Sequence, residues 1–181
     1  MPDSYLIAGV AKVSVHVPPV GIKLTKSDAR PWEEKWTLIL HNRDRLEVIY
    51  RGQMAGAGSL DAESAANNVF IECHNLKDWL KWTLPGGITK KAVNDFFRES
   101  GPLTEAAALS NSHKHHTRND GGMLARIRQY ESDSVGSGCK MECEMYWGDE
   151  SRSYTKDALA LADECVAEWR KFFRKHNISE P

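Results

Sequence analysis

The sequence predicts a mainly helical α+β protein: a bundle of about five helices with an antiparallel β-hairpin before the C-terminal helix and a short β-like N-terminal arm. Apolar residues recur three and four positions apart in several long segments, which is the spacing of one face of a helix. One late segment instead alternates strictly between apolar and polar residues, which is the period of a strand. The 181 residues fit one domain with its own core.

Composition and charge exclude several classes of protein. Apolar residues make up 41% and charged residues 27%, both near the averages of globular proteins, which argues against a disordered or fibrous chain. A net charge of -1 excludes a surface of uniformly positive potential, so any RNA binding must use a local patch. The four cysteines form no Cys-x2-Cys pair, so we expect them to be reduced and to hold no zinc.

Residues 1–26 are predicted to form an N-terminal strand or arm. In KVSVHV three valines alternate with polar residues, and VGIKL repeats this pattern after Pro18 and Pro19. The acidic Asp3 and the two prolines do not fit a signal peptide, and the chain has no run of about 18 apolar residues. We therefore expect a cytoplasmic protein that does not contact a membrane.

Residues 27–181 are expected to form the helical bundle. The first helix should begin at Pro31, with Glu33 and Glu34 in its first turn, and should end near Gly52. Its inward stripe should consist of Trp32, Trp36, Ile39, Leu40 and Arg43.

A second long helix, LDAESAANNVFIECHNLKDWLKWTL, should follow the loop GQMAGAGS and end at Pro85. Its inward stripe should consist of Ala62, Ala66, Val69, Cys73, Leu76 and Leu80. Thr89 should then cap a shorter helix, KKAVNDFFRES, with Ile88 and Val93 packed together across its start.

Gly101 and Pro102 should separate that short helix from a fourth, which includes EAAALSNSHKHHTR at residues 105–118. At about residues 123–148, LARIRQYES and CKMECEMYW should pair as an antiparallel hairpin across the loop DSVGSG, with the apolar side of the hairpin on the helices. The closing helix, TKDALALADECVAEWRKFFRKH, should bury Ala158, Leu161, Ala162, Cys165, Trp169, Phe172 and Phe173.

Polar residues continue the apolar stripe of the fourth helix. At roughly 100° per residue, the residues that share this stripe are Leu103, Ala107, Asn111, Lys114 and Arg118, with Ser110 and His115 at its margins. Burying an unpaired ammonium costs several kcal/mol, so an inward Lys114 needs a carboxylate nearby. The second helix offers Asp78, with His74 one turn before it, while Glu72 lies on another face.

Two interpretations of this cluster remain open. In the first, Asp78 pairs with Lys114 or orients an imidazole, and His74, Asn111 and His115 complete a cleft that binds phosphate or moves a proton, as in metal-independent RNA cleavage. In the second, the same residues form a structural network that holds the helices in register. Loss of Asp78 or Lys114 should then cost about 3–5 kcal/mol of stability.

The histidines of SHKHH also raise the possibility of a metal site. His113 and His116 lie three apart and share a helical face, but His115 points elsewhere and no fourth ligand stands at a recognised spacing. A metal-dependent hydrolase is therefore the weaker, third hypothesis, and we expect no cofactor.

Three motifs carry a resemblance to a known group of proteins: CHNLKDW at Cys73–Trp79, NSHKHH at Asn111–His116, and EWRKFF in the last helix. They resemble uncharacterised bacterial proteins with a His-x3-Asp-Trp stretch followed by Asn-x2-Lys-His. That group is similar in layout to HEPN domains, and the likeness covers roughly residues 30–178.

The resemblance implies a helical bundle of a toxin–antitoxin or phage-defence system, many members of which cleave RNA with an Arg-x4-6-His motif. The one Arg-x5-His match, Arg170 to His176, has Lys171 where such domains usually carry a polar residue. We therefore place the predicted site at His74, Asp78, Asn111, Lys114 and His115, with RNA as the expected partner. The alternative is a non-enzymatic module that binds a protein partner or a second copy of the chain.

Overall fold

The structure is a computed structural model that describes residues 31–114, 122–132, 138–147 and 152–181. The predicted N-terminal arm, residues 1–26, lies outside the described residues. Five helices and three strands follow in the order α1 (Trp32–Tyr50), α2 (Ser59–Thr83), α3 (Lys90–Glu99), α4 (Gly101–Lys114), β1 (Met123–Ser132), β2 (Cys139–Trp147), β3 (Arg152–Asp157) and α5 (Ala158–Lys175). The predicted α+β class, with a hairpin before the last helix, is confirmed.

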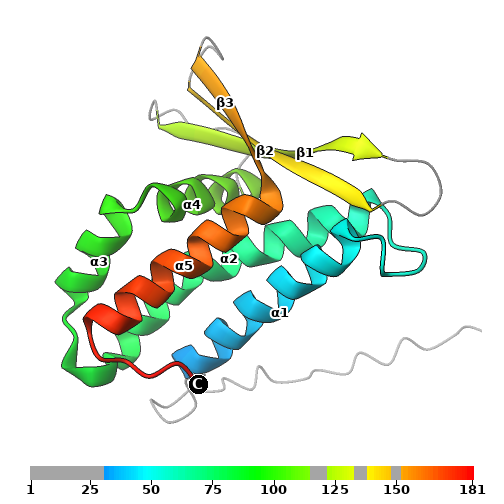
Figure 1. Cartoon of the computed structure of the whole chain (residues 1–181). Coiled ribbons are helices and arrows are strands. Elements are labelled where there is room, and N and C mark those ends of the chain that lie inside the picture. Colours follow the sequence, from blue (N-terminus) through cyan, green and yellow to red (C-terminus); the bar gives the residue numbers. More distant parts are fainter. Residues whose placement is uncertain (1–30, 115–121, 133–137, 148–151) are drawn as a thin grey trace, which may run out of the picture.

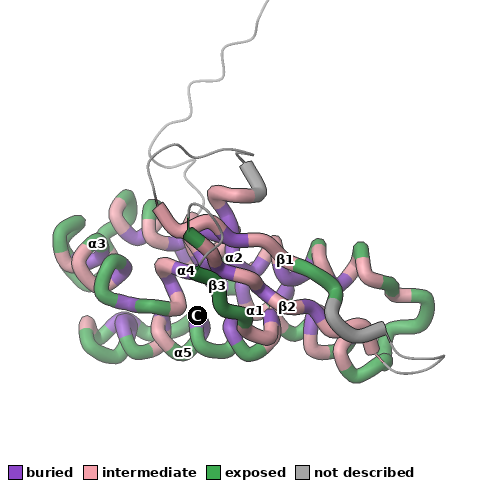
Figure 2. The backbone as a smooth tube through the Cα atoms, turned by 90° about the horizontal axis from the view of Figure 1, so that it is seen from above, coloured by how far each residue is buried: buried purple, intermediate pink, exposed green. Residues whose placement is uncertain are grey.

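The helices and the sheet form separate layers. Figure 1 shows the sheet on one side of the helices, with α4 beneath it and α1, α2 and α5 side by side below. Helix α2 contacts every other helix, and α4 packs against both α2 and β1. Figure 2 shows that the buried positions follow the inner sides of these elements and the exposed positions follow the outer sides. None of the helices within the described ranges has the length and apolar character needed to cross a bilayer.

Local signals in the sequence set the helix ends. The Thr89 hydroxyl accepts a hydrogen bond of 3.1 Å from the Ala92 backbone N–H, which confirms the predicted cap of α3. Ile88 and Val93, on either side of this cap, are both buried, as a hydrophobic staple requires. Helix α2 ends at Thr83, followed by Leu84 in the left-handed conformation and by the short 3-10 turn Pro85–Gly87.

The core lies between the apolar faces of α1, α2 and α5. All the residues predicted to point inward from α2 and α5 are buried. In α1 the prediction holds for Trp32, Trp36 and Ile39, but Leu40 and Arg43 are only half-buried. The buried stripe of α1 instead continues through Asn42, Leu46 and Ile49.

Aromatic side chains from α1, α3 and α5 pack against one another in the core. The rings of Trp36 and Phe173 meet edge to face, with centroids 5.1 Å apart, and Trp169 lies 6.1 Å from Phe97 of α3. Such pairs contribute about 0.5–1.5 kcal/mol each beyond the burial of their area. This cluster therefore fixes α5 against both α1 and α3.

The sheet is antiparallel, with strands in the order β1, β2, β3. The helix-facing residues Met141, Cys143 and Met145 are buried, which confirms the predicted orientation of the hairpin. The third strand corrects the prediction for Thr155–Asp157, which were expected to open the last helix. Tyr154 pairs with Met145 of β2, and Asp157 accepts a hydrogen bond from the Ala160 N–H as the helix cap, so α5 begins at Ala158.

Tyr50 at the end of α1 completes the hydrogen bonding of β2. Its hydroxyl donates to the Met141 carbonyl oxygen at 2.8 Å and accepts from the Met141 N–H at 2.9 Å. Met141 lies one residue beyond the last pair of the β2–β3 ladder, Glu142 with Asp157. A side-chain carbon on Gly138 would stand 2.0 Å from the Tyr50 carbonyl oxygen, so the chain passes α1 at this point only because residue 138 is glycine.

Replacing Tyr50 with Phe should lower the free energy of unfolding by about 1–3 kcal/mol, because both backbone groups of Met141 lose their partner in a half-buried place. Urea unfolding measures the change. Tyr146→Phe, on the outward face of the same strand, is the control and should stay within about 0.5 kcal/mol of the parent. Equal losses in the two variants would contradict the assigned role of Tyr50.

Candidate functional site

His74 forms the centre of a polar junction between α2 and α4. Its half-buried ring has Nδ1 3.3 Å from the hydroxyl of Ser110, a residue with only 1% of its surface exposed. The ring also stacks on Phe97 of α3, with centroids 5.8 Å apart and planes 30° apart. The imidazole is therefore held by three helices at once.

Lys77, one turn along α2, approaches the other nitrogen of the same ring. Its Nζ lies 3.2 Å from His74 Nε2 and 4.7 Å from the centre of the Phe97 ring. An ammonium can only donate, so Nε2 accepts and the proton of the neutral imidazole lies on Nδ1, from which it is donated to Ser110. Burial lowers the pKa of Lys77, and the charge of Asp78, which raises this pKa, only partly offsets the effect. The Lys77 ammonium is therefore a better proton donor than that of a free lysine.

Asp78 lies at the outer edge of the junction. Its side chain is 63% exposed and forms an ion pair of 2.6 Å with Lys81 of the same helix. Burial opposes ionisation, but the hydrogen bond from Lys81 and the charges of Lys77, Lys81 and His74 outweigh it and lower the pKa of Asp78. An ion pair this exposed is worth at most about 1 kcal/mol, so the cost of 3–5 kcal/mol expected for a buried Asp78 does not apply.

Near the end of α4, the face of the helix that points into the core differs from the predicted face. The buried side chains include Leu103, Ala106 and Ser110, whereas Ala107 and Asn111, which were expected to point inward, are half-buried. Ser110, predicted at the margin of the stripe, is therefore the polar group that reaches into the core. The physical reason is that α4 is covered on two sides, by α2 and by the sheet, so that its buried surface is wider than one stripe.

Part of the predicted cluster lies outside the described residues. The side chain of Lys114 and the whole of His115 are in this category, as are the side chain of His113 and the whole of His116, so the predicted pairing of Lys114 with Asp78 stays a prediction. Among the described residues, no group of three His, Cys, Asp or Glu side chains is placed to hold a metal ion. Glu72, on another face of α2 as expected, forms an ion pair of 2.8 Å with Lys35 of α1.

The Arg-x5-His match does not form a site. Arg170 lies over the Trp36 ring, 5.8 Å from its centre, and its Nε is 3.3 Å from Glu180. His176 packs instead on Phe172, with ring centroids 4.5 Å apart. Six residues of helix turn the chain by about 240° beyond one full turn, which directs the two side chains to different faces.

A second polar cluster, around Glu105, was not predicted from the sequence. Glu105 of α4 is buried, accepts a hydrogen bond of 2.7 Å from the Tyr154 hydroxyl and forms an ion pair of 3.0 Å with Lys156. Lys156 also binds Glu164 of α5 at 2.9 Å. Because Tyr154 and Lys156 belong to the third strand, the cluster could be recognised only once that strand was placed beside α4.

Comparison of the chain with protein-family models, with curated proteins and with solved structures gives no match. The expected resemblance to HEPN domains stays a prediction from the sequence motifs. The class of protein that the described fold defines is a helical α+β bundle covered on one side by a three-stranded antiparallel sheet.

The Glu105 cluster should make stability depend on pH in the alkaline range. Burial and the hydrogen bond to Glu105 raise the pKa of Tyr154 to about 12, whereas a tyrosine in the unfolded chain ionises near about 10. The stabilisation is thus present below pH 10 and is lost as pH rises towards 12. Urea unfolding at a series of pH values should show a shallower alkaline loss for Tyr154→Phe than for the parent; parallel losses would contradict this assignment.

Proposed function

We propose that the chain is a HEPN-like, nucleic-acid-directed protein that cleaves RNA without a metal, as a toxin or phage-defence component. The observation that carries the proposal is the contact of 3.2 Å between His74 Nε2 and Lys77 Nζ. This contact places a proton acceptor, the imidazole of His74, beside a cation, the ammonium of Lys77, whose pKa is lowered by burial. Cleavage of a phosphodiester without a metal requires both kinds of group.

The proposed reaction uses the 2′-hydroxyl of the RNA as the nucleophile. When RNA binds, its 2′-hydroxyl replaces Lys77 as the hydrogen-bond donor to His74 Nε2, and Nε2 takes the hydroxyl proton while the bond from O2′ to phosphorus forms. The bond from phosphorus to O5′ breaks, and the Lys77 ammonium gives a proton to the departing oxygen. The products are a 2′,3′-cyclic phosphate and a 5′-hydroxyl, and transfer of a proton from protonated His74 to the Lys77 amine restores both groups.

The other predicted residues support this reaction in separate roles. The Ser110 hydroxyl accepts the hydrogen bond that Nδ1–H donates, and so favours the tautomer in which Nε2 carries the lone pair. The carboxylate of Asp78, whose charge interacts with that of His74, favours the imidazolium that forms during the reaction. Asn111 and Lys114 are proposed as phosphate contacts and His115 as a second acid–base group.

A second candidate function is a non-enzymatic interaction module. The observation that favours it is the stacking of the His74 ring on Phe97 and its bond to buried Ser110, which are contacts that hold α2, α3 and α4 together whether or not a substrate binds. In this case the junction stabilises the bundle, and an outer surface binds a protein partner or a second copy of the chain.

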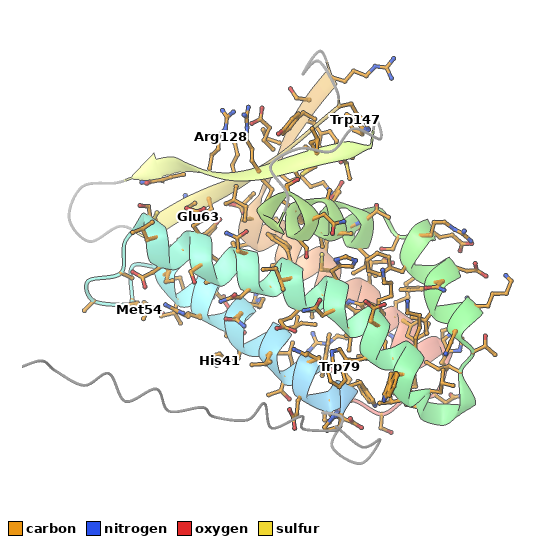
Figure 3. The ribbon with its side chains drawn as sticks, turned by 180° about the vertical axis from the view of Figure 1, so that it is seen from behind. His41, Met54, Glu63, Trp79, Arg128 and Trp147 are labelled. Carbon is orange, nitrogen blue, oxygen red and sulfur yellow. The ribbon has the colours of Figure 1, made fainter. Side chains whose placement is uncertain are left out.

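Replacing His74 with Gln separates the two candidates. If His74 moves a proton, cleavage of a mixed-sequence RNA should fall by about a hundredfold or more. His41→Gln is the matched control, because His41 is an exposed histidine on α1 (Figure 3), a helix that supplies no residue to the junction, and it should cleave like the parent. Gel analysis of the products measures both, and thermal melting shows whether each variant is folded.

Two results would contradict the ribonuclease proposal. One is a folded parent protein that leaves varied RNA intact, with the same outcome after His115→Ala and Lys114→Ala. The other is cleavage by His74→Gln at the rate of the parent. A large fall in melting temperature in His74→Gln, in a protein without cleavage, would favour the interaction module.

A further inference from the structure

A groove of about 300 Å³ lies between the end of α2 and the start of α3. Its lining consists of Asp78, Lys81, Trp82, Lys90 and Asn94. Asp78 is thus shared between this groove and the junction around His74. The groove is open to solvent, and one of its walls is an aromatic ring.

Trp82 is the most exposed of the described tryptophans. It has 59% of its surface exposed, whereas Trp32, Trp36 and Trp169 are almost fully buried in the core. More than half of the Trp82 surface is thus left in contact with water by the fold of the chain. The ring is placed to offer a flat face to a ligand that enters the groove.

The charges around Trp82 are mainly positive. Lys81 is paired with Asp78, and Lys91 with Asp95, but Lys90 has no ion-pair partner among the described residues. Lys77 adds a further cation at the junction end of the groove. The whole chain carries a formal charge of -1, so this concentration of lysines is local and would attract an anion to this place rather than to the surface at large.

We infer that this groove binds single-stranded RNA, with one base stacked on Trp82 and the adjoining phosphates on Lys81 and Lys90. Aromatic rings flanked by lysines bind single strands because every base presents a π face and every nucleotide carries a phosphate. Asn94 supplies an amide that can both donate to and accept from the edge of that base. A duplex is not expected to bind, since its base faces are already stacked.

The inference rests on the proposed function and extends it by naming where the strand lies. His74 and Trp82 are eight residues apart on α2, which is about 12 Å along the axis and about 80° round it. A single strand held at Trp82 can therefore reach Lys77 and His74 by passing Asp78. The groove positions the strand, and the junction acts on it.

Fluorescence anisotropy with a labelled single-stranded RNA of mixed sequence tests the inference in the full chain. The RNA carries 2′-O-methyl groups, which remove the nucleophile and so prevent cleavage during the measurement. Trp82→Ala should weaken binding by about tenfold, as expected for the loss of one stacked base. Trp147→Ala is the matched control, because Trp147 is an exposed tryptophan on the sheet, away from the groove (Figure 3), and should bind like the parent.

The charges are tested through the salt dependence of the same affinity. Lys90→Gln should reduce the slope of log affinity against log salt by about 0.7, the value for one phosphate contact on a single strand. Arg152→Gln, on the exposed edge strand of the sheet, removes the same charge elsewhere and should leave the slope unchanged. Equal effects of Lys90→Gln and Arg152→Gln would overturn the inference, because they would indicate attraction by the whole surface.

The remaining outcomes separate the groove from the chemistry. Equal RNA affinity in Trp82→Ala and Trp147→Ala overturns the assignment of RNA binding to the groove. The proposed function still stands if cleavage that depends on His74 persists. Binding that depends on Trp82, in a protein that cleaves nothing, supports the groove and removes the catalytic part of the proposal. A folded parent that binds no RNA overturns both and favours a protein partner.

Discussion

The burial of helix α2 is the constraint on which the rest of the structure depends. This helix is 25 residues long and contacts all the other helices as well as β1 and β2. Its buried face is built largely from small residues: Ala62, Ala65, Ala66 and Cys73 have no exposed surface. Small side chains let the neighbouring helices approach closely, and a larger residue at any of these positions would force the packed side chains and backbone around it to shift.

The candidate site lies at the edge of the buried face of α2, a face that continues beyond His74 through Leu76 and Leu80. Towards its C-terminus α2 extends beyond α4 and the sheet, to the place where α3 and the C-terminal end of α5 lie (Figure 1). His74 and Lys77 stand at this boundary, half-buried, where a polar group can keep contact with solvent and still be held in place by Ser110 and Phe97. Asp78 and Trp82, further along the same helix, are exposed.

The parts of the fold that depend on local patterning could be predicted from the sequence. The stripes of α2 and α5, the cap at Thr89 and the alternation of β2 each involve residues close in the chain, and the structure confirms them. The third strand could not be predicted in this way, because RSYTKD has no apolar alternation and becomes a strand only by pairing with β2. Ser110 was placed at a margin because a single stripe does not describe a helix that is covered on two sides.

The predicted site shows the same limit. Periodicity identified His74 and Asp78 as neighbours on α2, but it could not show that Lys81 takes the carboxylate or that Phe97 of α3 lies against the imidazole. The contact with Phe97 depends on how α3 folds back after Pro85–Gly87, and the pairing of Asp78 depends on which of the nearby lysines of α2 reaches it. The Glu105 cluster likewise needs α4, β3 and α5 to be assembled before its members meet.

The most direct test of the account is the tautomer of the His74 imidazole. Long-range proton–nitrogen correlation spectra of the nitrogen-labelled protein at neutral pH distinguish the two ring nitrogens, and comparison with His74→Gln assigns the signal. The account predicts a neutral ring with its proton on Nδ1, facing Ser110, and an unprotonated Nε2 facing Lys77. A neutral ring with its proton on Nε2 would contradict it, because that nitrogen could then neither accept from Lys77 nor take a proton from RNA.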